Sequence, residues 1–362
     1  MPSTRPRMSF DSSGICNACS LKKRSVDFEA RKKEFFKLFE DMEYKHQVYD
    51  CVVAWSGGKD SSSIALRLKY EFNLNPLLVT FSPLIPTEVG WQNKRKINEL
   101  GFDSIEITTK QNISKSLSRR FFIERGDPKL HWNAGINSAP IRVAEFYSIP
   151  IIFYAEHGES EYGGKIISPN SERERDIDEI LENQIGDDPL NWICEEITEK
   201  DLFNYRFPES LGMSNKLRAL YFSYFSKWDV NDNFSYVKKF FEFQTNPNGR
   251  TYGTFTNYDS IDDHMDDLYY FMQYIKFGFG RCLRDCARQI QHGRMTREHA
   301  IDLIREYDGE FPESTIGRCL DYLEIDESTF WETVDRHRPE HVWTKVGGKW
   351  KLRSPVWDTF TP

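Results

Sequence analysis

Short apolar runs alternate with amphipathic stretches through the first 160 residues. The apolar runs predict buried strands at 49–55, 77–81, 105–108 and 150–155. Helical spacing of apolar residues predicts helices at 27–45, 61–72, 88–100 and 137–147. Strands that alternate with helices of this length indicate an α/β fold with a doubly wound, mostly parallel sheet.

The pattern changes after Gly164. Residues 165–260 are polar and aromatic with few strand signals, residues 262–305 have helical spacing, and the basic tail 340–362 predicts a hairpin around Gly347 and Gly348. We therefore divide the chain into three parts, which are an N-terminal arm at 1–45, an α/β domain at 46–200, and a mainly helical, aromatic-rich C-terminal region at 201–362.

Composition narrows the class of protein. Hydrophobic residues make up 39% and charged residues 29% of the 362, which is typical of a globular chain. A net charge of -8 disfavours a broad nucleic-acid surface, because phosphate neutralisation needs a basic face. We expect no membrane span, since no apolar run reaches 18 residues, and no secretory signal at the N-terminus. Seven cysteines, an odd number, favour a reducing compartment, and we expect the cytoplasm.

The strongest chemical signal lies between the first strand and the next helix, at Ser56-Gly57-Gly58-Lys59-Asp60-Ser61-Ser62. Adjacent glycines allow consecutive amides to turn toward an anion, and the helix that follows points its unpaired amides the same way. The serines add hydroxyl donors and the lysine adds positive charge. Asp60 would repel phosphate, so we expect it to cap the helix or to help hold magnesium.

This string is not a Walker A loop, in which the lysine follows a longer glycine-bounded turn. It resembles the PP-loop of the ATP pyrophosphatase superfamily, whose pattern is S-G-G-x-D-S after the first strand. The resemblance implies cleavage of ATP between the α- and β-phosphates and adenylation of a substrate oxygen. It assigns catalytic roles to Ser56, Lys59 and Asp60, and ATP binding to Ala54, Ser56, Gly57, Gly58, Lys59, Asp60, Ser61 and Ser62. The alternative is a Ser/Gly turn that only begins a helix.

Further segments across nearly the whole chain resemble the N-acetyl sugar amidotransferases of O-antigen and of pseudaminic or legionaminic acid glycans. The matching segments are 1–6, 10–11, 14–19, 31–35, 98–103, 134–136, 155–164, 254–258, 276–281 and 293–298. The resemblance implies that an acetamido group on a nucleotide-activated sugar becomes an acetamidino group. ATP with Mg²⁺ adenylates the amide oxygen, ammonia replaces it, and AMP and pyrophosphate leave.

The same resemblance implies partners. No cysteine lies in a G-x-C-x-G setting, and the chain begins Met-Pro, so we expect no glutaminase in this chain. A separate glutaminase and a cyclase-like subunit would then supply the ammonia. The sequence leaves open whether the chain forms a homo-oligomer.

Charged residues elsewhere are candidates for the same site. Glu156, Gly158 and Glu159 follow the fourth strand, at the end of a doubly wound sheet where ligands bind, and we assign Glu159 with Asp60 to magnesium. His157 could donate to a phosphate. We assign phosphate neutralisation to Lys276 and Arg281, and the same role is open to Arg294. For each of them the alternative is a solvated surface charge.

The sequence allows two interpretations for each of two cysteine pairs. Cys16 and Cys19 have the spacing of metal ligands, but one C-x-x-C is half of a tetrahedral zinc site. Family members carry another C-x-x-C just before the Met-Pro stretch. The pair therefore holds zinc or is a reduced pair. Cys282 and Cys286 share a helix face and either bind a cluster or pack as small hydrophobes, and Cys51 is expected in the core.

We interpret the remaining candidates as structural. The carboxylates at 262–263 and 266–267 suit a helix start. Trp91 and Trp132 are expected in the core, and the alternative is that they stack on a base or a sugar. The sequence leaves two alternative functions open. A tRNA-modifying PP-loop thiolase would need a basic face and a complete cysteine set, and a non-enzymatic subunit would have no need of the serine–glycine loop.

Overall fold

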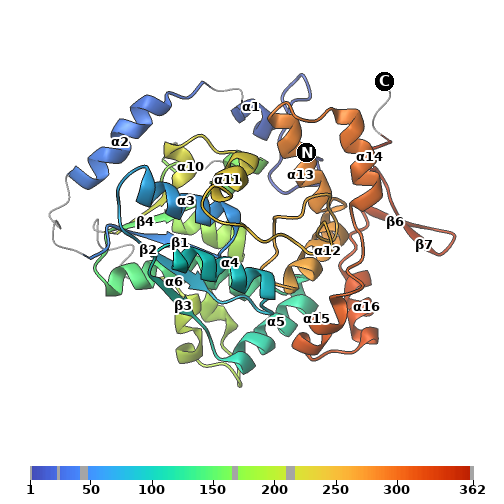
Figure 1. The fold of residues 1–362 in the computed structure, drawn as a ribbon. Coiled ribbons are helices and arrows are strands. Elements are labelled where there is room, and N and C mark those ends of the chain that lie inside the picture. Colours follow the sequence, from blue (N-terminus) through green and yellow to red (C-terminus); the bar gives the residue numbers. More distant parts are fainter. Residues whose placement is uncertain (1, 23–24, 41–47, 165–169, 209–216, 359–362) are drawn as a thin grey trace.

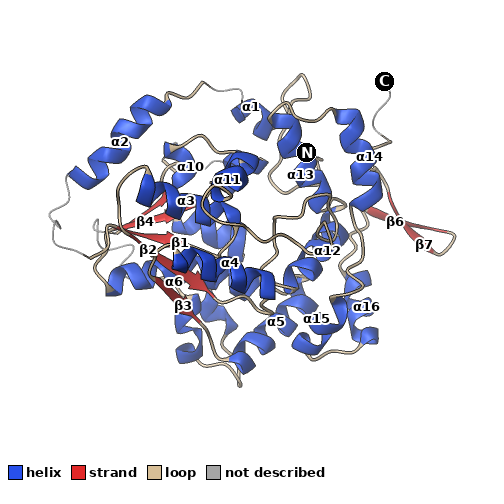
Figure 2. Ribbon diagram, viewed as in Figure 1, coloured by secondary structure: helices blue, strands red, loops and turns tan. Residues whose placement is uncertain are grey.

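The computed structural model describes residues 2–22, 25–40, 48–164, 170–208 and 217–358 (Figure 1). Five parallel strands form the central sheet in the order β3-β2-β1-β4-β5 (Figure 2). Their bounds are β1 Cys51–Ala54, β2 Pro76–Phe81, β3 Ser104–Ile107, β4 Ile151–Tyr154 and β5 Arg218–Tyr221. The chain moves outward from β1 to β3 and then returns to place β4 on the other side of β1. The strand order therefore reverses between β1 and β4, and a ligand crevice is expected there.

Helices cover both faces of the sheet. Up to β5 they are α1 Asn17–Lys22, α2 Phe28–Glu40, α3 Lys59–Tyr70, α4 Glu88–Glu99, α5 Gln111–Arg125, α6 Leu130–Phe146, α7 Gly158–Tyr162 and α8 Ile177–Ile180, with the short non-α turns η1 Leu181–Ile185, η2 Pro189–Trp192 and η3 Glu199–Tyr205. Alternate strand residues point to opposite sides. Val53 and Phe153 pack with α2, α3 and α10 (Phe222–Phe225), whereas Val52 and Ile152 pack with α6. A doubly wound, parallel α/β sheet is confirmed.

The C-terminal region is mainly helical, as predicted, and lies beside the sheet in Figure 1. Its helices after α10 are α11 Val230–Val237, α12 Met265–Phe277, α13 Arg281–Gln291, α14 Arg297–Tyr307, α15 Ile316–Leu323 and α16 Glu327–Arg336. The predicted terminal hairpin is also confirmed, as β6 Trp343–Val346 pairs with β7 Lys349–Leu352. Gly347 and Gly348 both have positive φ, at 59° and 78°, which a two-residue hairpin turn requires.

Three differences from the sequence expectations matter for the site. Helix α5 was not predicted, and α6 begins seven residues earlier than expected, at Leu130 instead of 137. Strand β5 was also missed, and it lies past residue 200, where we expected the α/β domain to end.

The predicted helix at 27–45 ends within the described residues at Glu40, and residues 41–45 lie outside them. No described helix combines the length and the apolar character that a bilayer crossing requires.

A close contact between α6 and β2 allows a test of the fold. A Cβ at Gly135 in α6 would collide with the ring of Phe81 at the end of β2. Gly135→Ala should therefore lower the free energy of unfolding by about 1–3 kcal/mol, although alanine favours helix formation. Gly317 in α15 has open space around it, so Gly317→Ala is the matched control and should raise stability by up to about 1 kcal/mol. Urea titration measures both, and equal effects would contradict the predicted contact.

Candidate active site

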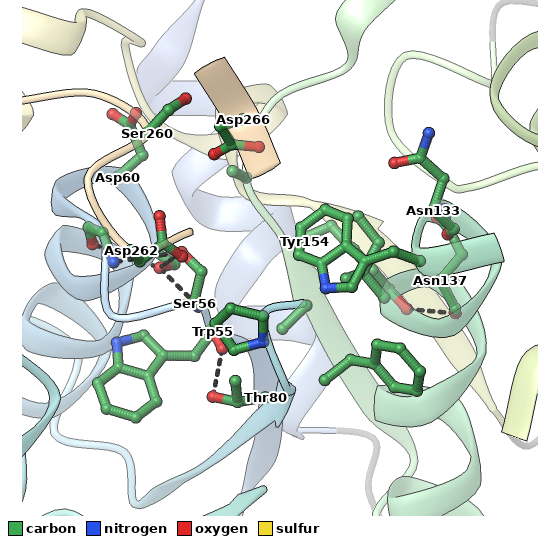
Figure 3. Close-up of a pocket in the computed structure, with 18 of the residues that line it drawn as sticks. Trp55, Ser56, Asp60, Thr80, Asn133, Asn137, Tyr154, Ser260, Asp262 and Asp266 are labelled. Atoms are coloured by element: carbon green, nitrogen blue, oxygen red, sulfur yellow. Dashed lines mark hydrogen bonds between the residues drawn. The ribbon is translucent and has the colours of Figure 1, made fainter. Parts of the chain in front are cut away.

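A pocket of about 500 Å³ opens at the carboxyl ends of β1, β2 and β4, where the strand order reverses. Its walls come from the loop after β1, from α6, from residues 258–262 and from the first turns of α12. Figure 3 shows Asp60, Ser260, Asp262 and Asp266 on one side of the pocket and Asn133 and Asn137 on the other. The sheet and the C-terminal region therefore both contribute walls to this pocket.

The turn after β1 is shaped by its glycines and serines. Gly57 has a φ of +88°, a conformation that other residues adopt with strain. The Ser56 hydroxyl accepts a hydrogen bond from the Gly58 amide at 3.2 Å, and the Ser61 hydroxyl accepts one from the Ser56 amide at 3.2 Å. Trp55 Nε1 donates to the buried Ser62 hydroxyl at 3.0 Å. These bonds fix the turn at the edge of the pocket.

Gly58 is the residue just before α3 and has no side chain with which to cap the helix. The first amides of a helix lack acceptors within the helix, and the positive end of the helix dipole lies beside them. Ser56, Gly58 and Ser61 line the pocket beside these amides. The arrangement can bind an anion with main-chain donors and hydroxyl groups.

Lys59 is buried, and its ammonium donates to Asp60 at 2.7 Å and to Asp259. Burial opposes the charge, but Asp259 and Asp60 raise the pKa of Lys59 above its ordinary value. Asn233 in α11 donates to the other Asp60 oxygen at 2.9 Å. The expected lysine charge is present at the pocket, and two carboxylates of the protein share it.

Glu156 lines the pocket just past β4. Burial and the nearby Asp60 raise the pKa of its carboxyl. The Tyr162 hydroxyl donates to Glu156, and a guanidinium nitrogen of Arg288 lies 3.7 Å from it. Arg288 also lies 3.6 Å from Asp259. Glu156 and Asp259 thus share one arginine at the edge of the site.

The opposite half of the pocket is aromatic with a polar margin. Tyr154 at the end of β4 donates through its hydroxyl to Asn137 O at 2.8 Å, and the Arg175 guanidinium lies 3.7 Å from the centre of its ring. Trp132 lines the same wall and donates to Ser82 O at 2.9 Å. Such a surface, flat rings with amide side chains at the margin (Asn133 and Asn137), suits a planar base.

The carboxylates at 262–267 have a larger role than the helix start we inferred. Helix α12 begins at Met265, and Asp262 and Asp266 line the pocket. Lys129 is buried and donates to Asp263 at 3.0 Å and to Asp266. Asp263 also accepts bonds from the amides of Leu84, Ile85 and Met265, each at 3.0 Å. The cluster fixes the start of α12 against the end of β2, and periodicity alone could not reveal its position at the site.

The structure brings together most of the candidate residues. Ala54, Ser56, Gly58, Lys59, Asp60, Ser61, Glu156 and Gly158 line the pocket. Gly57 shapes the turn, and Ser62 lies beneath it. Glu159 does not line the pocket, and its carboxylate instead accepts hydrogen bonds from Arg7 at 3.0 and 3.2 Å. The Asp60 and Glu159 pair that we assigned to magnesium is therefore not formed around the pocket.

The distant cations also lie outside the lining. Burial lowers the pKa of Lys276, which faces Asp127. Arg281 is fully buried and donates to the main-chain oxygen of Asp259, so it supports the pocket wall from behind. Arg294 pairs with Asp229. Both ring nitrogens of His157 have partners, Ser160 at 2.6 Å and Glu179 at 2.7 Å, and Trp91 is an exposed side chain.

The structure shows the surroundings of both cysteine pairs. Cys282 and Cys286 lie 3.8 Å apart in a small apolar cluster with Phe279. Cys16 and Cys19 lie close enough that hydrogen bonding between them lowers the pKa of Cys16 to about 5. Within the described residues, no group of three or more His, Cys, Asp or Glu side chains could hold a metal ion. Among the described residues, Cys16 and Cys19 therefore have no third ligand of these types nearby.

These features define an α/β protein with a Ser/Gly turn and a helix start that face a pocket at the reversal of strand order. Residues 252–355 match the family model described as LPS biosynthesis protein WbpG-like, C-terminal domain. This match links the chain to polysaccharide biosynthesis. A stretch of 77 residues is 35% identical to the uncharacterized protein MJ1599 of Methanocaldococcus jannaschii, and it covers 21% of this chain and 28% of that protein.

Asp262 gives a test of the pocket's electrostatics. Burial and the neighbouring Asp266 raise the pKa of Asp262 to about 6, so the folded state favours its protonated form. The protonated Asp262 side chain contributes fully to stability below the pKa of the unfolded state, which is near 3.9. This contribution is lost as the pH rises through about 6. Asp262→Asn should therefore be more stable than the unmodified protein at pH 7, by a margin that shrinks toward pH 4. Urea unfolding at the two pH values checks this, and a constant margin would contradict it.

Proposed function

We propose that this protein is an ATP-dependent amidotransferase of the PP-loop type. It converts the acetamido group of a nucleotide-activated sugar to an acetamidino group and releases AMP and pyrophosphate. The product serves the synthesis of a surface polysaccharide or a flagellin glycan. The match of residues 252–355 to a domain of LPS biosynthesis supports a role in polysaccharide biosynthesis.

One observation carries the proposal, namely the turn at Ser56, Gly57 and Gly58 at the head of α3, which faces a pocket at the sheet's reversal point. The turn offers main-chain amides and two hydroxyl groups to a diphosphate. Opposite it, the aromatic wall with Trp132 and Tyr154 suits adenine. A nucleotide with its base at this wall and its diphosphate at the turn would place the α-phosphate between them.

The reaction balances with these parts. The amide oxygen attacks the α-phosphorus, the bond to the departing diphosphate breaks, and the amide proton is released. Ammonia then forms the new carbon–nitrogen bond, the carbon–oxygen bond breaks, and AMP leaves with that oxygen while a proton of the ammonia is lost. The turn holds the departing diphosphate while negative charge develops on it. Donors that are fixed toward developing charge stabilise a transition state most.

Magnesium would accompany the nucleotide. This ion prefers carboxylate oxygens, phosphate oxygens and water, and one or two protein carboxylates are sufficient. Asp60 lines the pocket beside the turn, and its position is fixed by Lys59 and Asn233. We therefore assign the protein ligand to Asp60. A separate glutaminase and a cyclase-like subunit supply the ammonia.

The direct test uses purified protein with ATP, magnesium, ammonium and a diacetamido sugar nucleotide. We expect AMP, pyrophosphate and a product about one mass unit lighter than the acceptor, because an oxygen is exchanged for an NH group. Liquid chromatography with mass spectrometry measures all three. Formation of ADP instead of AMP, or activity only when tRNA is added, would exclude this reaction.

Two serines of α3 provide a matched pair of variants. Ser61 lines the pocket, whereas the buried Ser63 hydroxyl donates to Asp60 O at 2.8 Å and does not line it. Ser61→Ala should lower kcat/KM by about 10- to 100-fold, as expected for the loss of one donor to the departing diphosphate. Ser63→Ala should change it by less than about threefold. Equal losses in both variants would indicate a structural effect.

A third variant tests the turn itself. A Cβ at Gly58 would lie 3.2 Å from the Ser56 hydroxyl oxygen, and the branched side chain of Gly58→Val would extend further into this space. We expect AMP release to be abolished while thermal unfolding remains cooperative. Unchanged turnover in Gly58→Val would remove the turn from the mechanism.

A further inference from the structure

A second pocket, of about 960 Å³, adjoins the first. Its walls come from four segments, 86–89, 246–252, 260–267 and 310–318. Many of these residues belong to the stretch that matches the LPS biosynthesis domain. The proposed ATP site lies in the first pocket and leaves this second one free for another ligand.

The two pockets share a wall. Ser260 and Ile261 line both of them, Asp262 lines the first, and Asp263 lines the second. Ser260 has a φ of +48°, which is uncommon for a residue with a side chain and marks a constrained position. We name residues 259–263 the partition. Its first residue, Asp259, is the one that binds Lys59 of the turn.

The partition is fixed to the sheet side of the molecule. The Thr87 amide donates to Asp262 O at 3.2 Å, and its hydroxyl donates to Ile261 O. A Cβ at Gly90 would lie 2.7 Å from Asp262 Cα, so the start of α4 approaches the partition as closely as a glycine allows. Hydrogen bonds and close packing therefore fix the position of the shared wall relative to α4, and this fixed segment borders both pockets.

The second pocket has the polar groups of a site for a hydroxylated, phosphorylated ligand. Arg318 is exposed, its Nη1 lies 3.2 Å from His264 Nε2, and no carboxylate among the described residues forms an ion pair with it. Burial and Arg318 lower the pKa of His264, so the neutral ring accepts this bond. Arg318 thus presents a positive charge that a phosphate could neutralise.

The rest of the lining can recognise a sugar. Glu88 and Glu313 add carboxylate oxygens, which accept hydrogen bonds from hydroxyl groups, and Asn246 and Asn248 add amide side chains. The Arg250 guanidinium is held by Glu310 through two bonds of 2.6 Å, so these two side chains form a rigid part of the wall. Tyr252 and Phe311 lie in the same lining.

The proposed reaction needs two large substrates at once. Both ATP and a nucleotide-activated sugar carry a nucleoside, phosphates and further groups, and the first pocket is of a size for one ligand of this kind. The acceptor amide must still reach the α-phosphate. A second pocket that shares a wall with the first satisfies both conditions.

We propose that the second pocket binds the nucleotide-activated sugar while the first binds ATP. Arg318 contacts a phosphate of the acceptor, and the acetamido group reaches the first pocket past Ser260 and Ile261. This inference rests on the proposed function for the identity of the acceptor. The location of the site rests on the shared wall.

The first experiment asks whether the two nucleotides bind together. UDP-N-acetylglucosamine is the probe, and α,β-methylene-ATP fills the first pocket without being cleaved. Isothermal titration should show the probe binding to the protein with an affinity that saturating analogue changes by less than about threefold, since independent sites do not compete. Competition between them, or no binding of the probe at millimolar concentration, would overturn the proposal.

The second experiment removes the charge of Arg318. Arg318→Gln should weaken probe binding by about tenfold or more and leave the affinity for the ATP analogue unchanged. Arg318→Lys keeps the charge and should retain part of the binding. Arg95→Gln, an equal change at an exposed residue of α4 that lines neither pocket, is the control and should bind as the unmodified protein does. Probe binding that is unaffected in Arg318→Gln would overturn the assignment.

The two proposals can fail separately. Simultaneous binding of probe and analogue, with loss in Arg318→Gln, establishes the second pocket as a nucleotide-sugar site even if ammonium yields no AMP. In that case the amidotransferase reaction fails and the site remains. Titrations with UDP and with free N-acetylglucosamine show which part of the probe is recognised. Equal affinity for UDP in Arg318→Gln and in the unmodified protein would contradict the phosphate contact.

Discussion

The ion pair between Lys59 and Asp259 joins residues 200 positions apart and determines where the turn lies relative to the C-terminal region. The Lys59 side chain is 1% exposed and that of Asp259 is 14% exposed, so neither charge could be left alone without a large penalty. Loss of one partner of such a buried pair costs about 3–5 kcal/mol. Burial opposes ionisation of Asp259, but Lys59 and nearby arginines lower its pKa. Both charges therefore persist, and each holds the other in place.

The pockets follow from this pair. Because Asp259 is the first residue of the partition, the contact that orients the turn also positions the wall between the two cavities. Thr87 secures the same wall from the start of α4, and Lys129 secures the start of α12 through Asp263. The helical C-terminal region is thus not an appendage of the sheet. It supplies one side of each pocket.

The sequence predicted the local features of the site well, since the turn at Ser56, the following helix and four strands all carry short-range signals. It missed what depends on distant contacts. Strand β5 has only four residues, and it is recognisable as a strand because β4 pairs with it. Asp259 is an ordinary polar residue until the fold brings it to Lys59.

Helix α5 is a different case, because the signal was present and was not used. Its apolar residues Ile113, Leu117 and Phe121 recur at every fourth position, and Gly126 ends the helix with a φ of 61°. Period analysis over 111–125 would have found it. Helix α6 begins at Leu130, before the predicted start at 137, and it continues through Pro140, a residue that usually ends or kinks a helix.

The acidity of the pocket decides how an anion could be held there. Asp60, Glu156, Asp259, Asp262 and Asp266 all line it, and the lysine charge at the turn is already neutralised by two of them. Because these carboxylates outnumber the lysine and arginine side chains of the lining, side-chain charge alone would repel a triphosphate. The turn uses main-chain amides and hydroxyl groups, whose partial charges need no counterion and remain fixed when the ligand arrives. In the proposed function, anion recognition therefore rests on the geometry at Gly57 and Gly58, and the surrounding carboxylates are available to accompany a cation or to accept protons.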